Sequence, residues 1–146
     1  MSKKVIYAGV DSPLTREGKA VSDIAPGTFL KETADGLDVN DIEAVVFGEP
    51  LLVADKDQLR SKSVDDAWAI GENMVGILPR SGEIINALVA TGQTLIVGSP
   101  LARNGSGLLK LAATPASVSA TSEEIACFSD EAITTTATTL VRVRAA

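Results

Sequence analysis

The sequence predicts a mainly β protein: a single small β-barrel or β-sandwich domain with short strands, an extended N-terminal arm and at most one or two short helices. Three observations lead to this fold class. The chain has 146 residues, enough for one domain with its own core. Its hydrophobic fraction is 45% but only 3% of its residues are aromatic, so Ala, Val, Ile and Leu must build the core. Short apolar runs alternate with Gly- and Pro-containing turns, which favours strands over a helical bundle.

The N-terminal part differs from the rest of the chain. It contains one short apolar run, V-I-Y-A-G-V at residues 5–10, and is otherwise polar. We interpret residues 1–24 as an N-terminal arm and residues 25–146 as a β-rich domain. No apolar stretch approaches the roughly 20 residues that span a membrane, and the N-terminus has no long apolar signal region. The sequence therefore predicts a protein without a membrane segment.

The strands of the domain are predicted from apolar runs between turns. Residues 28–33 lie between the turn dipeptides Pro26-Gly27 and Asp35-Gly36. Residues 83–90 have helical apolar spacing, but their short length and β-rich content favour a strand. Residues 124–133 fit a strand or a helix. The remaining predicted strands are two runs around the Gly48-Glu49-Pro50 break, two runs within 67–78, and the runs at 94–101, 108–112 and 138–144.

One seven-residue pattern occurs twice. Residues 12–18 read S-P-L-T-R-E-G and residues 99–105 read S-P-L-A-R-N-G. Their flanking residues do not extend the match, so we interpret the pattern as one turn reused rather than a duplicated site. In that interpretation Pro fixes φ, Leu packs on apolar surface, and Arg-x-Gly forms an exposed turn. Asn104-Gly105 further predicts a hairpin tip at residues 103–107.

The residue types exclude several kinds of enzyme. The chain has no histidine, so it cannot build a Ser-His-Asp or Cys-His catalytic unit by itself. Cys127 is the single cysteine and lies in the mainly apolar run I-A-C-F, typical of a core residue. Asp35, Asp38 and Asp41 could offer oxygen ligands to Ca²⁺, but their spacing does not match a calcium loop. We predict no catalytic residues, no cofactor and no metal.

Charge is spread unevenly along the chain. The net charge is −6, and residues 32–66 alone hold ten Asp/Glu against three Lys/Arg. An acidic chain with few aromatic residues is a poor nucleic-acid binder. Positive charge lies near both ends, at Lys3, Lys4, Arg142 and Arg144. These four residues and Trp68, the only tryptophan, are the candidate contacts with a partner protein or with another subunit, although Trp68 could equally be a core anchor.

Residues 64–111 resemble the capsid decoration, or cement, proteins of tailed bacteriophages. The resemblance rests on Trp68-Ala69-Ile70-Gly71-Glu72, on the segment Arg80 to Leu88 and on the Gly-centred hairpin between Gly92 and Leu109. It extends, with A-P-G-T-F-L-K-E-T-A-D-G-L and the last basic strand, over residues 25–146. Trp68 stands where the family tends to have Tyr. The resemblance implies a non-enzymatic homotrimer that binds the major capsid protein on the outer capsid surface of a virion, having been made in the host cytoplasm.

Other functions fit the composition less well. A small-ligand or carbohydrate-binding β-barrel would need an aromatic-lined pocket, and a carboxylate-only enzyme would need two converging carboxylates in a cleft. Another phage structural part, such as a head-fibre base or a tail-tube component, would have the same β-rich composition. Location on the particle would distinguish that alternative from a cement protein.

Overall fold

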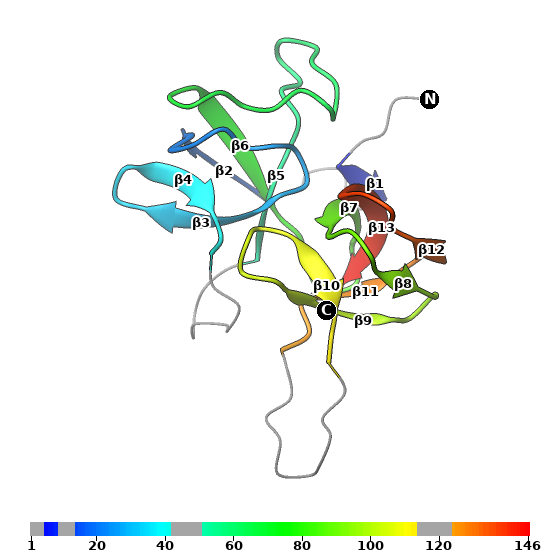
Figure 1. Cartoon of the computed structure of the whole chain (residues 1–146). Coiled ribbons are helices and arrows are strands. Elements are labelled where there is room, and N and C mark those ends of the chain that lie inside the picture. The colour runs from blue at the N-terminus through cyan, green and yellow to red at the C-terminus, as the bar shows by residue number, and fades with distance from the viewer. Residues whose placement is uncertain (1–4, 9–13, 42–50, 114–123) are drawn as a thin grey trace.

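The computed structural model describes residues 5–8, 14–41, 51–113 and 124–146 (Figure 1). Within these ranges the chain forms strands, turns and loops and no helix, so none of their segments could cross a membrane as a helix. The strands are β1 (Ile6–Ala8), β2 (Leu14–Lys19), β3 (Phe29–Thr33), β4 (Gly36–Val39), β5 (Leu52–Ala54), β6 (Asn73–Leu78), β7 (Ile84–Val89), β8 (Thr94–Leu95), β9 (Pro100–Arg103), β10 (Leu109–Leu111), β11 (Cys127–Ser129), β12 (Ile133–Thr134) and β13 (Thr139–Ala145). The predicted fold class, a small and mainly β domain, is confirmed.

The C-terminal half of the chain forms a closed five-stranded barrel. Its strands follow the order β7, β10, β9, β11 and β13, and β13 returns to pair with β7. That closing ladder is antiparallel and runs from Thr139 opposite Val89 to Arg144 opposite Ile84. Closure leaves no open edge between β13 and β7, which protects the barrel from pairing with other chains there. We call this unit the C-terminal barrel.

The second unit is a five-stranded sheet in the order β2, β6, β5, β3 and β4. The sheet curls until its two edges meet, because Ala20 bridges to Leu37 and the Val21 N–H donates to the Leu37 carbonyl at 3.0 Å. At this seam Gly36 has a φ of 143°, and a Cβ there would collide with the backbone carbonyl of Lys19. Only glycine allows the two edges to approach so closely. We call this unit the N-terminal sheet.

Three strands of the N-terminal sheet have a core on each face. Phe29, Val53 and Ile77 lie opposite one another across β3, β5 and β6 and pack with the core of the C-terminal barrel. Leu30 and Leu52, one position along, belong to the second core together with Met74 and Trp68. Successive strand residues point to opposite faces, so this alternation fills two cores from one sheet. The sheet is therefore a wall shared by both units.

Several strand predictions can now be compared with the structure. Residues 83–90 form β7, a strand as predicted, and residues 124–133 contain the strand β11 rather than a helix. The predicted hairpin tip joins β9 to β10, with the Asn104 Oδ1 accepting the N–H groups of Ser106 and Leu108. Of the two runs expected within 67–78, only the second is a strand, β6. Before it, Trp68 makes a single bridge to Ile24.

The interpretation of the repeated motif as an exposed turn is wrong for the first copy, and in the second copy it holds only for the turn at Asn104-Gly105. In the first copy, Leu14 to Gly18 lies within β2, which pairs with β6 along its whole length. In the second copy, Pro100–Arg103 is the strand β9 and Arg103 is buried, although Leu101 packs in the core as expected. Proline suits the first position of β9, because its missing N–H leaves one ladder bond unmade at the strand end.

The boundary predicted between an arm and a domain stays a prediction. Within residues 1–24, β1 pairs with β7 and β2 pairs with β6. Ala20 and Ile24 are buried in the second core.

Gly107 provides a test of how the two units are joined. It lies beyond the β9–β10 hairpin tip, where its N–H donates to the Asn40 carbonyl at 2.9 Å and its carbonyl accepts the Phe29 N–H at 2.8 Å. A Cβ on Gly107 would come within 2.6 Å of Thr28 Cγ2 and 2.7 Å of Val39 Cγ1. Gly107→Ala should therefore lower the free energy of unfolding by about 2–4 kcal/mol, from overpacking and left-handed strain together.

Gly82→Ala is the matched control, because Gly82 also has a positive φ, 87°, but nothing lies within 4 Å of its Cβ position. It should lose only the conformational part, about 1–2 kcal/mol. Urea denaturation of both variants measures the difference. Equal losses would show that the contact at Gly107 does not hold the units together.

Candidate functional site

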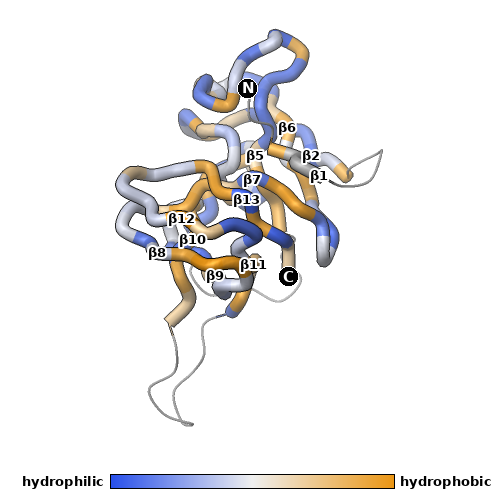
Figure 2. The backbone as a smooth tube through the Cα atoms, turned by 90° about the vertical axis from the view of Figure 1, so that its right-hand side faces the viewer, coloured by the Kyte–Doolittle hydropathy of each residue, from blue (hydrophilic) through white to orange (hydrophobic). Residues whose placement is uncertain are grey.

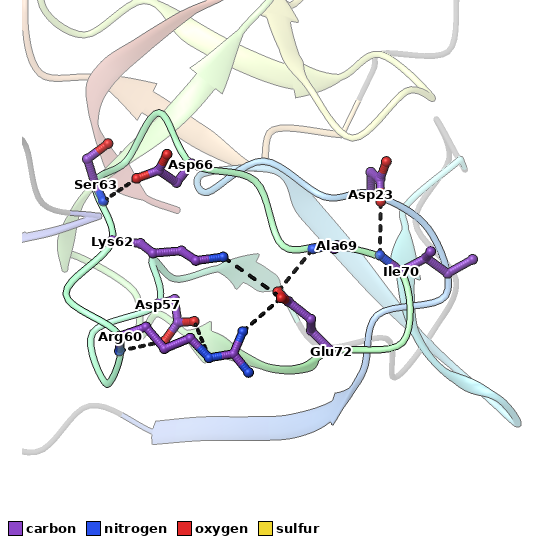
Figure 3. A network of polar contacts seen from close by, with 9 residues as sticks. All are labelled: Asp23, Asp57, Arg60, Lys62, Ser63, Asp66, Ala69, Ile70 and Glu72. Carbon is purple, nitrogen blue, oxygen red and sulfur yellow. Dashed lines mark hydrogen bonds and ion pairs between the residues drawn. The ribbon is translucent and has the colours of Figure 1, made fainter.

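A network of polar contacts organises the loop of residues 55–72, which connects β5 to β6 (Figure 3). Glu72 is its centre. One carboxylate oxygen, Oε1, lies 2.7 Å from Nη1 of Arg60 and 3.8 Å from Nζ of Lys62, and Oε2 accepts the Ala69 N–H at 3.1 Å. The hydrogen bond from the Ala69 N–H lowers the pKa of Glu72 below its ordinary value, and the contacts with Arg60 and Lys62 lower it further. Glu72 therefore stays ionised and ties two distant parts of the loop together.

The first of these parts is a tight turn that carries Leu59. Asp57 is buried and its Oδ1 accepts the Arg60 N–H at 3.1 Å, while its carbonyl accepts the Lys62 N–H at 3.0 Å. Arg60 returns an ion pair, with 3.5 Å between its Nε and Asp57 Oδ2. Leu59 is 98% exposed at the top of this turn. An ordered turn thus displays an apolar side chain to solvent.

The second part is a turn that carries Ile70. The Ile70 N–H donates to Asp23 Oδ1 at 2.9 Å, and the Glu72 N–H donates to the Ala69 carbonyl at 3.1 Å. Gly71 supplies the positive φ, 84°, that a turn of this kind requires. Ile70 is 67% exposed. Leu59 and Ile70 each neighbour a residue bound to Glu72, so one carboxylate fixes both apolar tips.

Trp68 lies beneath this loop as a core residue. It is buried in the second core, and its indole Nε1 donates to the Asp55 carbonyl at 2.7 Å. This burial matches the role of core anchor, the alternative that the sequence left open for Trp68. Burial raises the pKa of the Asp55 carboxyl, although that group accepts hydrogen bonds from Lys56 N and Gln58 Nε2. Asp55 is therefore a group that costs stability when it is ionised.

The two C-terminal arginines have different surroundings. Arg142 is half-buried: its Nε donates to Asp130 Oδ2 at 2.9 Å, its Nη2 donates to the Asp130 carbonyl at 2.9 Å, and its backbone N–H binds Glu131 Oε1. Its charge holds β13 to the turn after β11. Arg144 is exposed, and its Cζ lies 5.8 Å from the centre of the Phe128 ring. Their roles as capsid or subunit contacts stay predictions, and only Arg144 has its charge directed outward.

The other residues singled out by sequence carry no assembled reactive site. Lys3 and Lys4 lie outside the described residues. Cys127 is buried, as predicted, and burial raises the pKa of its thiol to about 12. Asp38 accepts hydrogen bonds from Ser22 Oγ and Val39 N, while Asp41 binds Lys31 Nζ at 2.6 Å. Among the residues that the structure describes, no three acidic, Cys or His side chains are grouped to hold a metal ion.

Sequence reasoning missed the 55–72 network. Residues 55–63, D-K-D-Q-L-R-S-K-S, have the polar composition of an exposed loop, whereas Asp55 and Asp57 are buried and the apolar Leu59 is exposed. The spacing of Asp57 before Arg60 was a usable signal, because aspartate often accepts a backbone N–H three residues ahead. Nothing local in the sequence marks Glu72 as the partner of Arg60.

Comparison with known proteins relates the fold to a phage structure. No protein-family model and no curated protein matches the sequence. Among solved structures, the chain is similar to "The crystal structure of head fiber gp8.5 N base in bacteriophage phi29". The fold resembles a head-fibre base. The TM-score is 0.55 and the identity 10%, and the similarity covers 92% of this chain and 95% of that chain.

Glu72→Ala should loosen the 55–72 loop without unfolding the protein. Removing the carboxylate breaks the contacts to Arg60, Lys62 and Ala69 together, so local opening becomes more frequent. Trypsin should then cleave after Arg60 and Lys62 about tenfold faster, as mass spectrometry of the fragments would show. Glu17→Ala, on the exposed strand β2, is the control and should cleave at the wild-type rate. An unchanged rate in Glu72→Ala would mean that the network does not order the loop.

Asp55→Asn should stabilise the protein at neutral pH. Because the folded-state pKa of Asp55 is raised, the free energy of unfolding of the wild type falls as the pH rises from the unfolded-state pKa of 3.8 through the folded-state pKa. At pH 7 the carboxyl group is ionised, and the full penalty of burying its charge remains. Asparagine removes the penalty: its Oδ1 can still accept the Lys56 N–H, and its Nδ2 can donate to the Gln58 Oε1 when that exposed amide turns over. The advantage over wild type in urea denaturation should shrink as the buffer is acidified. Asp35→Asn, at an exposed position, is the control; a less stable Asp55→Asn at pH 7 would contradict the assignment.

Proposed function

We propose that this protein is a structural component of a phage virion and forms the base of a head fibre on the outer surface of the capsid. The observation that carries the proposal is the extent of the structural similarity. It covers 92% of this chain and 95% of the head-fibre base, more than either the C-terminal barrel or the N-terminal sheet contains alone. The arrangement of both units is therefore what resembles the fibre base, not one small barrel.

The chemistry of the chain supports a structural role. The sequence has no histidine, and the single cysteine is buried with its pKa raised to about 12. Five charged side chains of the 55–72 loop make contacts within the loop and order it: Asp57, Arg60, Lys62, Asp66 and Glu72. Two exposed apolar side chains, Leu59 and Ile70, stand on that ordered loop as a protein contact would require.

The decoration role suggested by the sequence resemblance shares its location with this proposal. A cement protein and a fibre base would both contact the major capsid protein on the outside of the head, and both are compatible with the predicted homotrimer. They differ in what the particle loses without them. A cement protein stabilises the shell by binding it at many sites, whereas a fibre base holds a projection.

Electron microscopy of phage particles tests both parts of the proposal. Gold-labelled antibody against the recombinant chain should mark the outer surface of heads from the phage that encodes it. Deleting the gene should leave heads of wild-type heat stability that lack projections. Unlabelled heads would overturn the virion assignment, and intact projections on heads that open at lower temperature would favour the cement role instead.

A further inference from the structure

Four strands of the C-terminal barrel place a row of outward side chains side by side. Pro100 of β9 pairs with Phe128 of β11, Phe128 pairs with Arg144 of β13, and Arg144 pairs with Ile84 of β7. Their strand neighbours Leu101, Cys127, Val143 and Ile85 are buried in the barrel core, so the four members of the row face away from it. Pro100 and Arg144 are exposed, and Phe128 and Ile84 are half-buried. We call these four residues the Arg144 row.

The row continues into an exposed apolar turn. Ile96 and Val97 are 68% and 66% exposed, in a turn closed by the Ser99 N–H on the Ile96 carbonyl at 3.0 Å. Two further hydrogen bonds, Gly98 N–H to Ser129 O and Ser129 N–H to Ser99 O, fix this turn beside the end of β11. In Figure 2, β9, β11 and the C-terminus lie together on one side of the molecule. Apolar and aromatic groups around one arginine are the composition of an interface centre.

Arg144 is available for such an interface in a way that the neighbouring Arg142 is not. The carboxylate of Asp130 forms an ion pair with Arg142. Among the described residues no carboxylate pairs with Arg144, which instead lies over the face of Phe128. That cation–π contact places the guanidinium over the ring, and the Arg144 side chain stays exposed. An exposed arginine among apolar side chains indicates a partner that presents a negatively charged group at this surface.

We propose that the Arg144 row is the docking surface for an acidic segment of the capsid shell. A carboxylate of the shell forms a bidentate pair with Arg144, and apolar side chains beside it cover Phe128, Pro100 and the Ile96–Val97 turn. The proposal rests on the proposed function, since it names the part of the chain that contacts the head. Desolvation by the apolar members strengthens the charge pair relative to an exposed one.

Rebinding to empty sites tests this surface. Full-length recombinant chain is mixed with heads purified from a phage whose gene for the chain has been deleted, and bound protein is measured by co-sedimentation at about 0.05 M and about 0.5 M NaCl. Arg144→Gln should raise the Kd about tenfold at low salt and remove most of the salt dependence. Arg144→Lys should be intermediate, because lysine keeps the charge but not the planar pair or the stacking.

Arg16→Gln is the matched control, an exposed arginine on the N-terminal sheet whose side chain is 55% exposed and 3.7 Å from Glu32. It should bind as wild type does, and urea denaturation should show that all variants are folded. Wild-type binding by Arg144→Gln overturns the docking surface while the proposed function stands. If the wild-type chain does not bind the heads, the docking surface and the proposed function are both overturned. If Arg144→Gln instead lowers the mass of the free protein in light scattering, the row joins copies of this chain and the proposal is wrong.

Discussion

The shared wall formed by β3, β5 and β6 is the constraint on which the rest of the structure depends. Each of these strands must supply apolar side chains to both of its faces, since Phe29, Val53 and Ile77 fill one core and Leu30, Leu52 and Met74 the other. A shift of one residue in the pairing would send both sets to the wrong core. Both cores therefore specify the register of the wall, and neither the C-terminal barrel nor the N-terminal sheet can move independently of it.

The surface follows from this division of the molecule. Because the strands of the wall are used on both faces, the surfaces left for a partner include the 55–72 loop, the outer face of the C-terminal barrel and the exposed strand β2. The 55–72 loop joins β5 to β6 of the wall, and the Arg144 row crosses four strands of the barrel. Ion pairs have opposite roles in the two places. In the loop they fix the apolar tips, whereas in the row no carboxylate of the described residues pairs with Arg144, which is exposed.

Local sequence information predicted the parts of the fold that depend on local chemistry. The small-residue composition predicted the β class, Asn104-Gly105 predicted the hairpin tip, and the apolar run at 138–144 predicted the strand β13. The long-range features were out of reach, because nothing near Glu72 names Arg60 as its partner and nothing near Gly36 shows that Lys19 crosses there. The repeated S-P-L-x-R-x-G pattern misled for the same reason. Its Pro and Gly indicate a turn, but pairing with β6 holds the first copy extended. The cores show the same limit, since alternation identifies buried positions but not which of two cores receives them.

The position of β13 has a consequence for how the protein is made. The strands of the N-terminal sheet, with the loop between β5 and β6, lie within residues 14–78, so that unit can curl while the ribosome is still adding residues. The C-terminal barrel cannot close in this way, because β13 supplies the ladder to both β7 and β11 and is the last strand to emerge. Until then Phe29, Val53 and Ile77 present an uncovered apolar face. A nascent chain therefore exposes an apolar surface from the emergence of β6 until the emergence of β13, and its solubility in that interval depends on how soon β13 follows.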